Sequence, residues 1–162
     1  MNNIRTVKPE DSKQIAEIYN YYIKNTIITF EVTPVRASEM KKRIVEVIDE
    51  YPWFVFEDNE KILGYAYLSR YKSRCAYKNS VEISIYLRNG HENKGIGTAL
   101  LNQLFSEVAG SDIHAIIAGI ALPNEASIKL HEKFGFEKVA HFKEIGFKFG
   151  KWIDVGYWEK IV

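Results

Sequence analysis

One segment in the middle of the chain, residues 81–108, limits most strongly how the chain can fold. Its first seven residues alternate apolar and polar side chains, which is typical of a β-strand with one buried face. The polar run Asn93-Lys94-Gly95-Ile96-Gly97-Thr98 comes soon after, and apolar residues then recur at helical spacing as far as Val108. This succession predicts a strand, a tight loop and a helix that begins near Gly97.

The glycine loop suits an anionic ligand. Its two glycines let the backbone turn sharply and approach a ligand closely, and a helix start presents unpaired N–H groups at the positive end of the helix dipole. The loop therefore predicts a pyrophosphate site to which Lys94 adds charge, although a plain glycine-rich helix entry explains the same residues equally well. It is not a P-loop, and Leu100 replaces the third glycine of a dinucleotide fingerprint.

Two titratable residues are candidates for acid–base chemistry. Glu82 lies on the polar face of the strand just before the glycine loop and can act as a general base, directly or through a water molecule. His131, on a predicted helix, can exchange protons near neutral pH. Taken alone, each residue is more often a solvent-facing or structural side chain. The four histidines lack the spacing of a zinc site, so we expect no metal.

Hydrophobic periodicity predicts the element order β-α-α-β-β-β-α-β-α-β-β in a single α/β domain, residues 1–162. A hairpin with a four-residue connection at 58–61 joins the second and third strands, and Ser38 is expected to cap the second helix. The expected strands cover 4–7, 53–56, 62–71, 81–87, 115–120, 136–142 and 153–158, and the expected helices run to about 23, 50, 108 and 134.

Charge and composition exclude several classes of partner. The chain has 22 basic and 21 acidic residues, a net charge of +1, so it predicts no binding of nucleic acid or membrane surface. No apolar run approaches the roughly 20 residues that span a bilayer. The single cysteine, Cys75, and a start without a signal-peptide pattern predict a cytoplasmic location.

Two separated motifs resemble the GNAT superfamily of acetyltransferases. The acetyl-CoA signature appears as Glu92-Asn93-Lys94-Gly95-Ile96-Gly97, and a second signature runs from Asn124 to Phe136, with His131 where tyrosine is usual. The resemblance implies a GNAT fold, with a mixed, mostly antiparallel central sheet of about seven strands flanked by about four helices.

Further segments are similar to the phosphinothricin acetyltransferase family, which includes relatives acting on methionine sulfone and methionine sulfoximine. The most specific of them is Gly146-Phe147-Lys148-Phe149-Gly150-Lys151-Trp152-Ile153-Asp154-Val155. The others are Tyr51-Pro52-Trp53, Gly64-Tyr65-Ala66-Tyr67, Lys72-Ser73-Arg74-Cys75-Ala76-Tyr77, Glu82-Ile83-Ser84-Ile85-Tyr86-Leu87, Leu122-Pro123-Asn124 and Leu130-His131-Glu132.

The resemblance implies a role for each matching residue. Glu82 corresponds to the general base, and His131 to the residue that replaces the tyrosine. The implied cofactor contacts are Ile85, Tyr86, Leu87, Asn93, Lys94, Gly95, Ile96, Gly97, Thr98 and Asn124. The implied substrate contacts are Phe30, Lys72, Arg74, Tyr77, Ser84 and Tyr86. Asn93 stands where the family commonly has arginine, and Cys75 where it often has asparagine, so substrate preference stays open.

The resemblance thus implies an acetyl-CoA-dependent enzyme that acetylates the α-amino group of a small amino-acid-like substrate without a metal, as a homodimer. One alternative keeps the fold but acetylates a protein N-terminus or a polyamine. A polyamine site should be acidic, whereas Lys72 and Arg74 stand at this one. Another alternative is a non-catalytic acyl-CoA-binding regulatory module, which the retained Glu82 and His131 disfavour.

Overall fold

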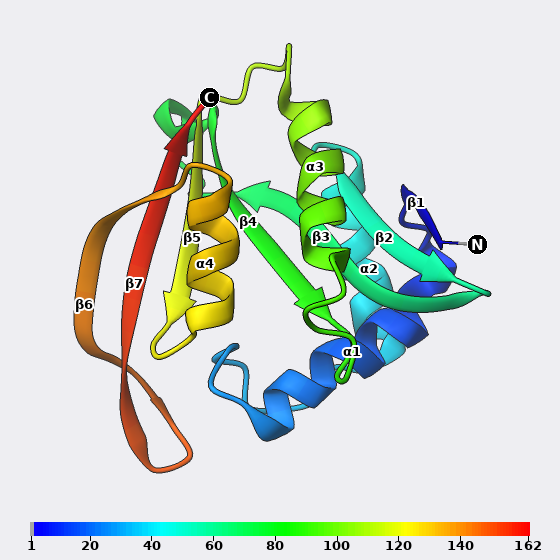
Figure 1. The fold of residues 1–162 in the computed structure, drawn as a ribbon, viewed down its shortest axis with the longest axis horizontal. Helices are drawn as coiled ribbons and strands as arrows, with labels where there is room; N and C mark the ends of the chain where they lie inside the picture. The colour runs from blue at the N-terminus through cyan, green and yellow to red at the C-terminus, as the bar shows by residue number, and fades with distance from the viewer. Residues whose placement is uncertain (1) are drawn as a thin grey trace. The chain divides into compact units, whose positions relative to one another are not determined.

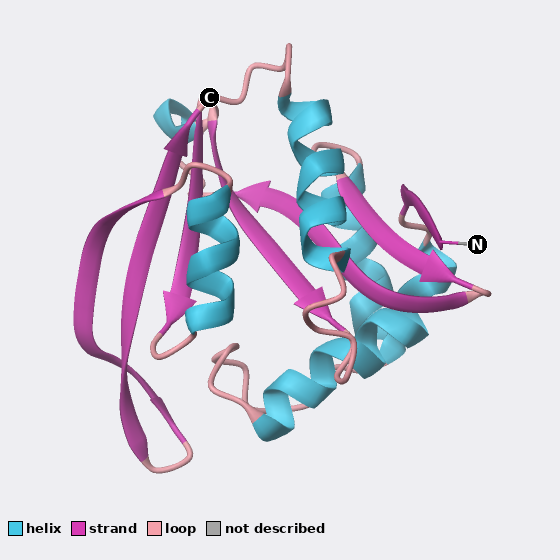
Figure 2. Ribbon diagram, in the orientation of Figure 1, coloured by secondary structure: helices cyan, strands magenta, loops and turns pink. Residues whose placement is uncertain are grey.

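The computed structural model describes residues 2–162, and Figures 1 and 2 show its helices and strands. The strands are β1 (Asn2–Thr6), β2 (Trp53–Asp58), β3 (Lys61–Arg70), β4 (Ser80–Leu87), β5 (Ala115–Ala121), β6 (Glu137–Lys148) and β7 (Lys151–Ile161). The helices are α1 (Ser12–Asn25), α2 (Ala37–Ile48), α3 (Ile96–Val108) and α4 (Glu125–Lys133), with short 3-10 turns at Pro9–Asp11 and Cys75–Tyr77.

The seven strands form a mixed sheet in the order β1-β2-β3-β4-β5-β7-β6. Strands β1, β2 and β3 pair antiparallel, and so do β5, β7 and β6, whereas β4 and β5 run parallel. The mostly antiparallel sheet with four helices, predicted from the sequence, is confirmed.

The chain folds into two compact units. The first comprises the residues up to Tyr21, Val35–Ser69 and Ile83–Asp112, and the second comprises Tyr22–Pro34, Arg70–Glu82 and Ile113–Val162. In the first unit, α3 contacts β1 and β2. Its fully buried side chains include Ile15, Val55, Ile62, Leu68, Leu100, Leu101 and Leu104.

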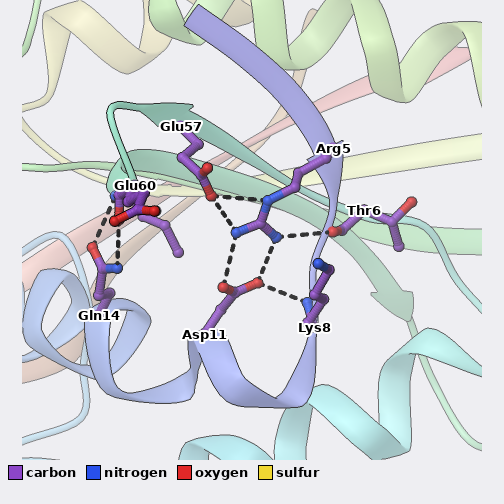
Figure 3. A network of polar contacts seen from close by, with 8 residues as sticks. Arg5, Thr6, Lys8, Asp11, Gln14, Glu57 and Glu60 are labelled. Carbon is purple, nitrogen blue, oxygen red and sulfur yellow. Dashed lines mark hydrogen bonds and ion pairs between the residues drawn. The ribbon is translucent and has the colours of Figure 1, made fainter. Parts of the chain in front are cut away.

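A polar network centred on Arg5 ties β1 to β2 and to the first turn of the chain's first helical segment (Figure 3). The Arg5 guanidinium donates to both carboxylate oxygens of Asp11, at 2.8 and 3.0 Å, and to Glu57. The backbone N–H of Lys8 also donates to Asp11, at 2.7 Å. Burial is the largest influence on Asp11 and opposes its ionisation, but these hydrogen bonds prevail and lower the pKa of Asp11.

In the second unit, β5 lies between the start of β4 and β7, and β6 pairs with β7 in a long hairpin (Figure 1). Phe149 and Gly150 form its two-residue turn, both at positive φ (53° and 70°). Helix α4 contacts β5, and Trp158 Nε1 on β7 donates to Glu132 Oε1 at 3.1 Å.

Three local predictions from the sequence were wrong. Helix α2 begins at Ala37 with Arg36 at its N-cap, so Ser38 lies inside the first turn and is not the capping residue. The β2–β3 connection has two residues, Asn59 and Glu60, both at positive φ, in place of four. The last two strands are longer than predicted, because the irregular pairing between Phe142 and Gly146 lets β6 continue past a break in the apolar alternation.

Candidate active site

The predicted pyrophosphate loop opens α3 in the first unit. Gly95 is the N-cap residue at a φ of 79°, a left-handed conformation that favours glycine, and no side chain caps the helix from that position. A Cβ at Gly95 would meet no atom within 4 Å, so the backbone faces open space. Asn93 also has positive φ, at 59°. This geometry fits an anion at the helix start.

The residues of the loop differ in accessibility. Asn93 and Lys94 are exposed and can reach a ligand's phosphates, Gly97 is buried and Thr98 is half-buried. Glu92 accepts a hydrogen bond from the Gly90 N–H at 2.9 Å, which holds the carboxylate within the preceding turn. Lys94 is therefore the exposed cation among the predicted cofactor contacts.

The second half of β4 carries the residues predicted to contact substrate and the pantetheine arm, and Ser84, Ile85, Tyr86 and Leu87 are all half-buried. The Tyr86 ring is fixed edge-on to Tyr19 and tilted against Tyr65, at centroid distances of 5.2 and 5.5 Å. A Cβ at Gly64 would lie 3.2 Å from the Tyr86 carbonyl oxygen and 2.7 Å from Leu87 Cδ2. Strand β3 therefore approaches this part of β4 closely because residue 64 is glycine.

The start of β4 carries Glu82, which belongs to a cluster in the second unit. The Glu82 side chain is accessible to solvent, yet crowding by protein atoms raises the pKa of this carboxyl, and the nearby positive charge of Lys72 partly offsets the rise. Lys72 Nζ lies 5.1 Å from the ring centre of Tyr71 and 5.6 Å from that of Tyr77. The two rings meet edge to face. The structure thus brings together Glu82, Lys72 and Tyr77.

Tyr157 on β7 also belongs to this cluster, although it was not among the predicted site residues. Burial raises the pKa of Tyr157, and the charge of Glu82 adds to that rise. The register places both on one face of the sheet, because Glu82 pairs with Ile117 and Tyr157 pairs with Gly119, two residues along β5. Only this non-local pairing could have revealed that Tyr157 lies on the same face as Glu82, because the sequence of its own segment indicates an ordinary strand.

The other two predicted substrate contacts lie elsewhere in the second unit. Arg74 is exposed and precedes the 3-10 turn Cys75–Tyr77 without capping it through its side chain. Phe30, 40% exposed, lies in the segment that follows α1, with its ring beside Gly146 of β6. Their proposed contact with substrate stays a prediction.

His131 is almost fully buried on α4, at 3% exposure. Its Nδ1 lies 2.8 Å from the Ser127 carbonyl oxygen, which can only accept, so Nδ1 carries the proton. Burial is the main influence and lowers the pKa of His131, although this hydrogen bond opposes the shift. The neutral ring leaves Nε2 as an acceptor, and within residues 2–162 nothing hydrogen-bonds to it. A buried polar atom of this kind indicates a missing partner.

Asn124 has a structural role in addition to its predicted one. Its Oδ1 accepts a hydrogen bond from the Ser127 N–H at 3.2 Å and caps α4. The contact of Asn124 with a cofactor stays a prediction. Across the described chain, no group of three or more His, Cys, Asp or Glu side chains is arranged to hold a metal ion. No helix among the described residues is long and apolar enough to cross a membrane.

Comparison with known proteins identifies the family to which this fold belongs. The family described as "Acetyltransferase (GNAT) domain" matches residues 4–156. The chain therefore belongs to the GNAT acetyltransferases, and the resemblance found in the sequence is confirmed.

Individual relatives indicate which acetyltransferases within this family the chain resembles. The chain is 37% identical to phosphinothricin N-acetyltransferase of Streptomyces coelicolor, covering 97% of this chain and 94% of that protein. It is 32% identical to the L-methionine sulfoximine/L-methionine sulfone acetyltransferase of Salmonella typhimurium, covering 95% of this chain and 91% of that protein. A crystal structure of the phosphinothricin acetyltransferase of Sinorhizobium meliloti in complex with acetyl-CoA superposes on this chain with a TM-score of 0.95. The two chains are 35% identical, and the superposition covers 99% of this chain and 88% of that one.

Proposed function

We propose that this protein transfers the acetyl group of acetyl-CoA to the α-amino group of a small amino-acid-like substrate of the phosphinothricin, methionine sulfoximine or methionine sulfone type. The observation that carries the proposal concerns Glu82, which lies on β4, the strand that leads into the glycine loop. Its carboxylate is accessible to solvent, has a raised pKa and lies near the positive charge of Lys72. The names of the relatives support the same substrate class.

In the proposed reaction, Glu82 accepts a proton from the substrate's ammonium group, directly or through a water molecule. The free amine attacks the carbonyl carbon of the acetyl thioester; a C–N bond forms, the C–S bond breaks, and coenzyme A leaves as a thiolate. The second proton of the attacking nitrogen passes to solvent, from which the thiolate is protonated. Orienting the two substrates supplies on the order of 7–11 kcal/mol of the barrier reduction. Its raised pKa makes the Glu82 carboxylate a stronger base than an ordinary glutamate.

Three cationic side chains are assigned to the two substrates. Lys72 is proposed to attract oxygens of the acceptor, either the anionic oxygens of a carboxylate or phosphinate or the polar oxygens of a sulfone, with Arg74 as a second cation. Lys94 and the N–H groups at the start of α3 are proposed to bind the pyrophosphate of acetyl-CoA.

His131 is proposed to act through Nε2 as a hydrogen-bond acceptor. The sequence indicated a residue that exchanges protons near neutral pH, but the neutral ring already uses its one proton at Nδ1. An acceptor role agrees with a buried nitrogen that has no partner within residues 2–162. His131 thus orients a donor group of a substrate and does not supply a proton.

The functional unit is proposed to be residues 1–162 as one domain that assembles into a homodimer in the cytoplasm. Exposed aromatic side chains on β6 and β7 support self-association, because the Phe147 and Trp152 rings form a pair 4.8 Å apart while 58% and 64% exposed. Light scattering of the purified protein should give twice the mass of one chain, and Trp152→Ser should reduce it to that of a monomer.

The central test follows thiol release from acetyl-CoA with a panel of amines. The panel holds methionine sulfoximine, methionine sulfone, phosphinothricin, the twenty amino acids, spermidine and a short peptide. We expect turnover on the first three, a roughly 10²–10⁴-fold loss in Glu82→Gln, and full activity in the control Glu107→Gln, which removes an exposed carboxylate on α3. Turnover only on spermidine or the peptide would refute the substrate assignment. Binding of acetyl-CoA without turnover would favour a regulatory module.

A further inference from the structure

Lys148, the last residue of β6, is a buried lysine whose burial the reaction does not explain. Its exposure is 3%, and it is the only lysine in the buried class among the described residues. Lysine is almost never fully buried without a partner, because an ammonium group loses hydration there. Desolvation accordingly lowers the pKa of Lys148.

The ammonium group is held by backbone carbonyls and not by a carboxylate. Nζ donates to the Thr29 carbonyl oxygen at 2.7 Å and lies 3.5 Å from the Tyr22 carbonyl oxygen. Its distance to the ring centre of Phe149 is 5.1 Å. Tyr22 lies in the last turn of α1, and its carbonyl oxygen also accepts from the N–H and the hydroxyl of Thr26. The negative end of the helix dipole attracts cations to this turn. Within residues 2–162 no ion pair involves Lys148.

Thr29, the residue whose carbonyl binds Lys148, directly precedes Phe30. The Phe30 ring lies against Gly146, where an added Cβ would come within 2.4 Å of two ring carbons. Gly146 and Lys148 are two residues apart on one face of β6, and they are the two buried positions of that strand. The segment 26–34 therefore contacts β6 at two adjacent points, one polar through the Thr29 carbonyl and one aromatic through Phe30.

We propose that Lys148 is a positioning residue for acceptor specificity: by binding the Thr29 carbonyl, it seats the Phe30 ring on Gly146 and fixes one wall of the acceptor pocket. The proposal rests on the proposed function and on the predicted contact of Phe30 with the acceptor. Lys148 itself is too buried to touch substrate. Its loss should therefore affect the acceptor and leave acetyl-CoA binding unchanged.

The kinetic test compares Lys148→Met with Lys151→Met, which removes an exposed lysine paired with residue 148 across the hairpin turn. In Lys148→Met, kcat/KM for methionine sulfone should fall roughly 10- to 100-fold, the scale of a misplaced contact. The preference for that acceptor over alanine should shrink, and the KM for acetyl-CoA should stay within about twofold. Lys148→Arg, which keeps charge and donors, should restore part of the preference. Unchanged preference in a folded Lys148→Met enzyme would overturn the proposal.

A double-mutant comparison tests whether Lys148 acts through Phe30. The acceptor preference of Phe30→Ala/Lys148→Met should equal that of Phe30→Ala alone. Additive losses would instead show that Lys148 acts independently of the ring. If Lys148→Met fails to fold, Gly146→Ala displaces the ring while leaving the lysine, and it should reduce the same preference without changing the KM for acetyl-CoA.

A readout without catalysis separates this proposal from the proposed function. Hydrogen exchange of residues 26–34 should be at least about tenfold faster in Lys148→Met than in the wild type or Lys151→Met, because the bond that holds Thr29 is gone. Faster exchange in a protein that acetylates none of the acceptors would support the role of Lys148 in holding residues 26–34 on β6, and it would refute the proposed function. Unchanged exchange would refute that role of Lys148 even in an active enzyme.

Discussion

The ring of Tyr157 lies over Gly119, so that a Cβ at residue 119 would stand 3.2 Å from Tyr157 Cε1. The two residues are opposite each other on β7 and β5. Because residue 119 is glycine, the Tyr157 ring has room against β5 on the face of the sheet that also carries Glu82. Phe142, edge-on at 5.4 Å, packs against another side of the ring.

A branched side chain at position 119 should therefore displace Tyr157. We expect Gly119→Val to lower kcat/KM for the acceptor about tenfold or more, with Gly119→Ala milder because the ring needs to move only a few tenths of an ångström. Steady-state kinetics at saturating acetyl-CoA measures the loss. Equal activity of wild type and a folded Gly119→Val enzyme would show that the ring's position has no part in catalysis.

The pH profile should report the charge next to Glu82. Activity requires the carboxylate, so kcat/KM should fall as pH drops through the raised pKa of Glu82. Lys72 lowers that pKa by its positive charge, and Lys72→Met should raise it, which moves the acidic limb to higher pH. Lys78→Met, an exposed neighbour, serves as the control. A limb that moves to lower pH in Lys72→Met would contradict the electrostatic assignment.

The Arg5–Asp11 pair should contribute stability that depends on pH. Because the folded state lowers the pKa of Asp11, its contribution is present above the ordinary value of 3.8 and is lost as pH falls through the folded value. Asp11→Asn should cost about 1–3 kcal/mol at pH 7 and less at a pH below the ordinary value of 3.8, where the contribution begins to be lost. Urea unfolding at both pH values measures this difference, and an equal loss at the two would indicate a packing effect.

Cys75 should be dispensable, because the reaction proposed here forms no acetyl-enzyme. It is an exposed, free thiol that the proposed transfer does not use. Cys75→Ala should keep the wild-type rate within about twofold. Mass spectrometry after incubation with acetyl-CoA should detect no stable acetyl adduct. An inactive but folded Cys75→Ala enzyme would require a covalent route.

The sequence predicted the element order because strand alternation and helical spacing are local signals. The capping of α4 by Asn124 follows from similarly local chemistry, and so does the left-handed Gly135, at a φ of 85°, just after the helix ends at Lys133. The position of Tyr157 over Gly119 was not predictable, since it depends on the register between β5 and β7. The burial of Lys148 was hidden for the same reason: its partner carbonyls lie 119 and 126 positions away.

The placement of β1 at the end of the strand order has a consequence for any shortened form of this protein. All five residues of β1 pair with one edge of β2, from Asn2 opposite Asp58 to Thr6 opposite Phe54. Strand β2 begins with Trp53-Phe54-Val55-Phe56, an apolar run that would expose unpaired N–H and C=O groups without β1. Such an edge pairs readily with another chain. A protein that lacks residues 1–6 should therefore precipitate during expression, and this aggregation should be detected before any loss of turnover.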